Sequence, residues 1–86
     1  MADEWELRVH RAVVSAIHSL PREHAVAIRR VLVELCEDPR PAGSRSVIGI
    51  DNTSEVFVGF FRIVYQIDEK QRCIKVAMVN LSVANQ

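Results

Sequence analysis

The sequence lacks the features that mark several large classes of protein. None of its apolar runs approaches the ~18 residues that a membrane-spanning helix needs. Its first residues, MADEWELR, are acidic and contain no apolar stretch like that of a secretory signal. The chain has only 86 residues, which is enough for one domain. We therefore expect a single small soluble domain spanning residues 1–86, located in the cytoplasm, with no membrane partner.

An excess of positive charge is also absent, since 11 Lys and Arg residues are balanced by 11 Asp and Glu residues. Proteins that grip a nucleic-acid backbone usually carry a basic excess, because neutralising phosphates and releasing counterions supplies much of their affinity. Composition therefore gives nucleic-acid binding no support. Only a local basic patch could supply it.

Cysteine is scarce, and the two cysteines, Cys36 and Cys73, lie far apart within apolar stretches. Their surroundings predict reduced, buried side chains. Neither has a His or Cys neighbour at the close spacing of a metal site. His10, His18 and His24 form no HxxxH pair and are interpreted as surface or helix-end residues. The sequence thus predicts no metal and no cofactor.

Hydrophobic periodicity predicts a strand and two helices in the first half of the chain. Residues 5–9 alternate between apolar and charged side chains, which is typical of a half-buried strand. Residues 10–20 change to helical spacing. Pro21 is expected at the first position of a second helix, where its missing N–H costs nothing. That helix should end at Asp38, because the residue before a proline is driven out of helical geometry.

The second half reads as strands separated by turns. Residues 38–46 are expected to form a loop, residues 51–54 a turn and residues 68–72 a hairpin turn. The extended segments should be residues 47–50, 55–58, 61–67 and 73–79. Gly59 and Phe60 fit a two-residue type II′ hairpin turn, with Gly59 supplying the positive φ. This turn pairs Val58 with Phe61, Phe57 with Arg62 and Val56 with Ile63. The expected fold is α+β, in the order β-α-α-β-β-β, with a helical hairpin on one face of a mostly antiparallel sheet.

Three motifs together resemble a known family. They are Leu20–Pro21 between the helices, the segment DPRP at residues 38–41, and the segment VGFFRIVYQIDE at residues 58–69. With the order of elements, they resemble the RelE/ParE superfamily of toxins over residues 5–79. The resemblance implies the toxin component of a type II toxin–antitoxin system. It also implies a cognate antitoxin as partner and, for RelE-like members, ribosome-dependent cleavage of mRNA without a cofactor.

The resemblance also assigns candidate catalytic residues. Arg62 matches the sheet arginine that contacts the scissile phosphate, and Arg45 matches a basic position that helps to hold RNA. Two departures weaken this machinery. Family members carry further Lys or Arg on the strand before the glycine turn, whereas residues 55–58 read EVFV. They also carry catalytic side chains near the C-terminus, whereas residues 80–86 read NLSVANQ.

Plainer interpretations of these residues remain open. Arg62 could be an exposed strand residue paired with Glu55, and Arg45 could be an ordinary loop residue. Tyr65 is most simply a core aromatic, because it alternates with Ile63 and Ile67.

The sequence also leads to expectations about one surface of the sheet and about three candidate functions. The face of the sheet away from the helices should be apolar and covered by an antitoxin segment. The residues expected there are Val56, Val58, Val64, Val76 or Ala77, Met78, Leu81 and Val83. The leading function is an mRNA endoribonuclease of reduced activity. The alternatives are a non-catalytic protein that binds DNA gyrase in the manner of ParE, or a degenerate toxin that only captures antitoxin.

Overall fold

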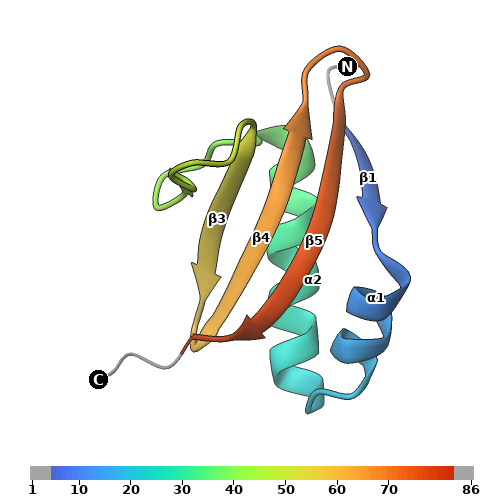
Figure 1. The fold of residues 1–86 in the computed structure, drawn as a ribbon. Helices are drawn as coiled ribbons and strands as arrows, with labels where there is room; N and C mark the ends of the chain where they lie inside the picture. The colour runs from blue at the N-terminus through green and yellow to red at the C-terminus, as the bar shows by residue number, and fades with distance from the viewer. Residues whose placement is uncertain (1–4, 83–86) are drawn as a thin grey trace.

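The computed structural model describes residues 5–82 and has two helices on one face of a five-stranded sheet (Figure 1). The elements are β1 (Glu6–Val9), α1 (Arg11–His18), α2 (Arg22–Glu37), β2 (Arg45–Ser46), β3 (Thr53–Val58), β4 (Phe61–Asp68) and β5 (Cys73–Leu81). This confirms the α+β class and the placement of both helices on one side.

The strand order β1-β5-β4-β3-β2 puts the first and last strands of the chain side by side (Figure 1). Only β1 is parallel to its neighbour, β5, and the remaining pairs are antiparallel. The sheet is therefore mostly antiparallel, as the sequence predicted. The helices form the connection between β1 and the rest of the sheet, as parallel neighbours require.

The hairpin between β3 and β4 has the predicted register. Val58 pairs with Phe61, Phe57 with Arg62 and Val56 with Ile63. Gly59 has a φ of +59°, whereas Phe60 is not among the described residues with positive φ. That combination fits the type II′ turn expected from a glycine at the first central position.

The ends of the helices differ from the prediction by one or two residues. α1 begins at Arg11, because His10 is its N-cap and accepts a hydrogen bond from the Ala12 backbone N–H at Nδ1, 3.0 Å away. Pro21 is the N-cap of α2, and its ψ of 148° is extended. Its place as the first helical residue was therefore wrong by one position. Neither described helix is long and apolar enough to cross a membrane.

The segment at residues 47–50 was expected to be extended and forms a turn instead. The strand there is the two-residue β2, immediately before it. Gly49 has a φ of +88°, and the Ile50 N–H donates to the Val47 carbonyl at 3.3 Å. Ile48 is 97% exposed, so its apolar character does not reflect burial. β3 consequently begins at Thr53 rather than at Glu55.

Alternation along β4 builds the core. Phe61, Ile63, Tyr65 and Ile67 are all buried against the helices, which confirms Tyr65 as a core aromatic. The helices supply Val13, Ile17, Ala25, Ile28, Leu32 and Leu35 to the same cluster. The Tyr65 hydroxyl donates to the Pro39 carbonyl at 2.7 Å and so ties the loop after α2 to the sheet. Burial raises the pKa of Tyr65, which keeps the hydroxyl protonated as a donor.

The apolar set expected on the far face of the sheet was partly wrong. Val56 is buried in the core and Val58 packs against it, because their partners across the hairpin, Ile63 and Phe61, face the helices. Val76 is also buried in the core. Met78 is exposed, and Val64 is half-buried. Val83 lies outside the described residues.

The Tyr65 hydrogen bond generates a stability prediction. Tyr65→Phe should lower the free energy of unfolding by about 1–2 kcal/mol, because it leaves a partly buried carbonyl without its donor. Urea denaturation measures the change. Phe60→Leu is the matched control, since Phe60 is 75% exposed and should change stability by less than about 0.5 kcal/mol. Equal stabilities for Tyr65→Phe and the wild type would contradict the role assigned to this bond.

Candidate site on the outer face of the sheet

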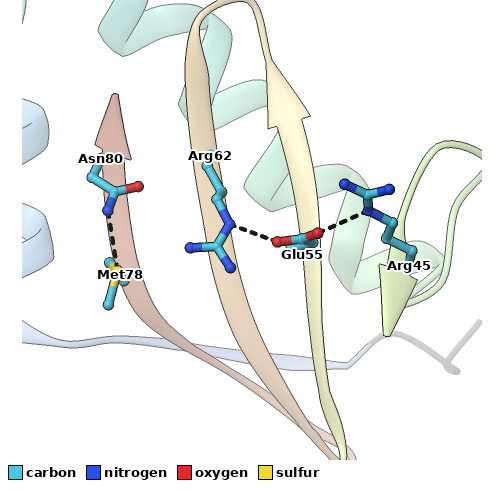
Figure 2. Close-up of polar contacts among 5 residues, drawn as sticks. All are labelled: Arg45, Glu55, Arg62, Met78 and Asn80. Atoms are coloured by element: carbon cyan, nitrogen blue, oxygen red, sulfur yellow. Dashed lines mark hydrogen bonds and ion pairs between the residues drawn. The ribbon is translucent and has the colours of Figure 1, made fainter. Parts of the chain in front are cut away.

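The face of the sheet opposite the helices, called the outer face below, carries both candidate arginines. Figure 2 shows Arg45 on β2, Glu55 on β3 and Arg62 on β4, with Met78 and Asn80 on β5. Pairing places them in neighbouring rows, since Arg45 pairs with Glu55 and Arg62 pairs with Asn80. Three neighbouring strands, β2, β3 and β4, thus bring Arg45 and Arg62 onto one surface, although the two residues are 17 positions apart in the sequence.

Glu55 joins the two arginines into one cluster. The Arg62 Nε donates to Glu55 Oε1 at 2.6 Å, and the Arg45 Nε donates to Glu55 Oε2 at 2.8 Å (Figure 2). Each carboxylate oxygen therefore accepts from a different guanidinium. Such charge-assisted bonds are shorter and stronger than neutral ones. We call Arg45, Glu55 and Arg62 the arginine–glutamate cluster.

The members of the cluster differ in exposure. The side chain of Glu55 is 11% exposed, that of Arg62 31% and that of Arg45 70%. Arg45 is also held by Phe57, whose ring centroid lies 5.7 Å from its Cζ. Within residues 5–82, neither arginine forms a hydrogen bond through its terminal Nη groups. Those donors remain available to an anion from outside.

The arginines change the titration of Glu55. The hydrogen bond from Arg62, and next that from Arg45, hold the pKa of the Glu55 carboxyl below its ordinary value, against the opposing effect of burial. The carboxylate is therefore charged at neutral pH. A carboxylate with a lowered pKa is a poor general base, because it binds a proton weakly.

The rest of the outer face is close to neutral. Arg8 is paired with Glu6 at 3.2 Å, and Lys75 with Asp68 at 3.5 Å. Together with the arginine–glutamate cluster, the described outer face has four cations and three carboxylates, which leaves one net positive charge. No basic patch of the size that grips a long nucleic-acid backbone exists on this face within the described residues.

The β5 side of the site holds no acid–base group. Asn80 faces Arg62, and its side-chain nitrogen lies 3.3 Å from the Met78 sulfur. Neither side chain exchanges a proton near neutral pH. The described part of the site can therefore hold an anion and stabilise negative charge, but it shows no residue suited to move protons.

The sequence predicted Arg62 and Arg45 as site residues, and it offered Glu55 only as a possible partner of Arg62. The structure shows that Glu55 binds both arginines, and it adds Phe57, which the sequence analysis left unassigned on this face. Only the face of these two residues could have been predicted, because the expected pairing of Phe57 with Arg62 places Glu55 and Phe57 on the face of Arg62. Among the described residues, no group of three or more His, Cys, Asp or Glu could hold a metal ion.

The architecture is a small α+β fold with two helices covering one face of a mixed sheet, and among solved structures it is the fold of the RelE toxins. A chain of the archaeal RelE–RelB complex from Pyrococcus horikoshii OT3 matches with a TM-score of 0.83 at 21% identity, over 92% of this chain and 96% of that chain. The isolated E. coli RelE toxin matches with a TM-score of 0.82 at 18% identity, over 95% and 88%. A chain of the RelBE2 toxin–antitoxin complex from Mycobacterium tuberculosis gives 0.78 and 18%, over 91% and 98%.

These identities establish a shared fold and confirm the structural part of the resemblance seen in the sequence. No protein-family model and no curated protein matches the sequence.

Glu55 generates a pH prediction. A pKa that is lower in the folded than in the unfolded chain adds stability above the unfolded value of about 4.3, and this stability is lost as pH falls through the folded pKa. Wild type should therefore exceed Glu55→Gln in free energy of unfolding at pH 7, with the difference shrinking below about pH 4.3. Ser46→Ala, a nearby change without an ionisable group, should show a difference from wild type that is independent of pH. A Glu55→Gln difference that stays constant down to pH 3 would contradict the coupling.

Proposed function

We propose that this chain is the toxin of a type II toxin–antitoxin system and acts on RNA through Arg62 and Arg45. One observation carries the proposal. On the RelE fold, both arginines lie on the sheet face away from the helices and converge on a single carboxylate. Donors that converge on two acidic oxygens are also suited to a phosphodiester, which likewise presents two anionic oxygens.

The chemistry would be attack of a ribose 2′-oxygen on the adjacent phosphorus. Negative charge grows on the phosphoryl oxygens in the transition state, and a guanidinium placed there stabilises it. Arg62, which lies on β4 and is held by Glu55 of β3, would contact the scissile phosphate. Arg45, which is more exposed, would hold a neighbouring part of the strand.

Cleavage of RNA by this chain alone should be slow, unless another molecule supplies the acid–base groups. General acid–base catalysis contributes about 10²–10⁴-fold where a positioned group exists. The one lysine of the described outer face, Lys75, is paired with Asp68, and His10, which borders this face beside Arg8 and Lys75, accepts a hydrogen bond from the Ala12 N–H as the N-cap of α1. Deprotonation of the 2′-oxygen would then rest on the ribosome, on water or on residues beyond those described.

An antitoxin is the partner that this proposal requires. Several solved chains with this fold are bound to the antitoxin RelB. Apolar side chains remain exposed on the outer face here, with Phe57 at 42% and Met78 at 44%. They flank the arginine–glutamate cluster, so a protein that covers them would also block access to Arg62.

Expression of the chain tests the proposed activity. Wild type should arrest growth and produce mRNA cuts within translated codons, detected by primer extension. Arg62→Ala should reduce cutting by about 100-fold or more, because it removes a donor that stabilises the transition state. Arg29→Ala, an equal loss of charge on the exposed side of α2, should leave cutting unchanged.

Other outcomes would replace the proposal with one of its alternatives. DNA damage signalling with intact mRNA would indicate gyrase inhibition instead. A chain with no toxicity that still binds an antitoxin would be a capture protein. Cuts that persist in Arg62→Ala would show that the outer face is not the catalytic site.

The antitoxin can be sought in the neighbouring reading frame. We expect a short gene that encodes a DNA-binding N-terminus and an amphipathic tail. Its product, co-expressed with this chain, should co-elute with it in size-exclusion chromatography and relieve the growth arrest. Phe57→Asp should weaken the complex by about tenfold or more, because it places a charge in an apolar contact. Val33→Asp, on the exposed side of α2, is the matched control. Equal affinities for Phe57→Asp and wild type would exclude this surface as the contact.

A further inference from the structure

Glu55 is the unexpected member of the site. A carboxylate repels a phosphate, yet this one lies between the two arginines that the proposed function assigns to RNA. It takes one short hydrogen bond from each guanidinium, at 2.6 and 2.8 Å. Both bonds come from Nε atoms, so the two arginines approach Glu55 from opposite sides (Figure 2).

We propose that Glu55 sets the RNA affinity of this site, because its carboxylate occupies the position between Arg45 and Arg62 that a phosphate of the RNA strand would take. The wild type then binds RNA weakly, and loss of the carboxylate exposes a phosphate site made of two arginines. This inference rests on the proposed function for the identity of the anion.

The hydrogen-bond geometry supports a Glu55 carboxylate that fills the anion position between the two arginines and does not merely lie near it. The two donors approach different oxygens of one acidic group, which is the arrangement that a bound phosphodiester would have. The side chain of Glu55 is 11% exposed, whereas Arg45 is 70% exposed. The internal anion thus lies beneath donors that solvent, and an RNA strand, can reach.

Charge gives the direction of the effect. With Glu55 ionised, the cluster carries two positive charges and one negative charge, which leaves one. Without Glu55 it carries two, and the Nε donors of both arginines lose their partner. The other cations of the outer face add little to the field, because Arg8 and Lys75 have carboxylate partners of their own. Electrostatic attraction between the site and an anion from solution is therefore stronger when Glu55 is replaced by an uncharged residue.

A second role for Glu55 predicts the opposite result. If its main effect were to hold the arginines in the geometry that RNA needs, its removal would let both side chains move and would weaken binding. The sign of the change in affinity separates the two roles.

Fluorescence anisotropy with a labelled single-stranded RNA hexamer, without ribosomes, measures that sign. Glu55→Gln keeps the size of the side chain and removes its charge. It should bind roughly fivefold or more tightly than wild type at low salt. Its plot of log affinity against log salt should be steeper by about 0.7, the slope for one more phosphate contact with a single strand.

Glu69→Gln controls for net charge. Glu69 is paired with Arg40 at 3.1 Å near the opposite end of β4, so this variant also removes one carboxylate and releases one arginine. Its affinity should stay within about twofold of wild type, since a single exposed charge outside the site contributes little. Adding Arg62→Ala to Glu55→Gln should abolish the gain. Circular dichroism confirms folding, and Glu55→Thr, which suits a strand, replaces Glu55→Gln if that variant folds poorly.

Unchanged or weaker binding in Glu55→Gln would overturn the inference, and so would an equal gain in Glu69→Gln. The proposed function fails separately. A gain in RNA affinity without any mRNA cutting in cells would leave the role of Glu55 standing and remove the ribonuclease. Cutting by wild type with no gain in the binding assay would do the reverse.

Discussion

The register of the β3–β4 hairpin is the constraint on which both the core and the site depend. Gly59, at a φ of +59°, permits a two-residue turn and so fixes which residues face each other. With that register, Phe61, Ile63, Tyr65 and Ile67 point toward the helices, while Arg62 points away from them. A slip of one residue would exchange the faces and place Arg62 in the core. The burial of four large side chains therefore also determines where the arginine lies.

The same register explains why the outer face is nearly neutral. Alternation puts Glu55 of β3 on the same face as Arg62 of β4. The short pairing of β2 with β3 brings Arg45 to the other side of Glu55. The exposed side of the helices is different. Arg11, Arg22, Arg29 and Arg30 form no ion pair within the described residues. A nonspecific anion would be drawn to those free arginines, whereas the proposed site offers two convergent donors that are already satisfied.

The sequence predicted well where local periodicity and burial agree. Side chains along β4 alternate strictly between the two faces of the sheet, and Gly59 fits the positive φ of a type II′ turn. The hairpin and its pairing could therefore be predicted residue by residue. Residues 47–50 could not, because an apolar stretch such as VIGI is compatible with a strand, and only the turn at Gly49 leaves Ile48 exposed. Val56 was assigned to the wrong face because an apolar residue on a strand does not reveal which face is covered. For the site, the resemblance indicated Arg62 and Arg45. That Glu55 binds both could not be predicted, because β2 was expected two residues later and Arg45 was expected in a loop.

Localisation of RNA on the folded chain tests the central claim most directly, which is that the outer face holds the functional site. The Nε–H resonances of ¹⁵N-labelled arginines report separately on each side chain during titration with a short single-stranded RNA. In Glu55→Gln, where both Nε donors are released from the carboxylate, the account predicts that Arg62 and Arg45 shift first and saturate together, while Arg29 and Arg30 on α2 change little at the same RNA concentration. Shifts confined to the helix arginines, with Arg62 and Arg45 unmoved at saturation, would contradict it.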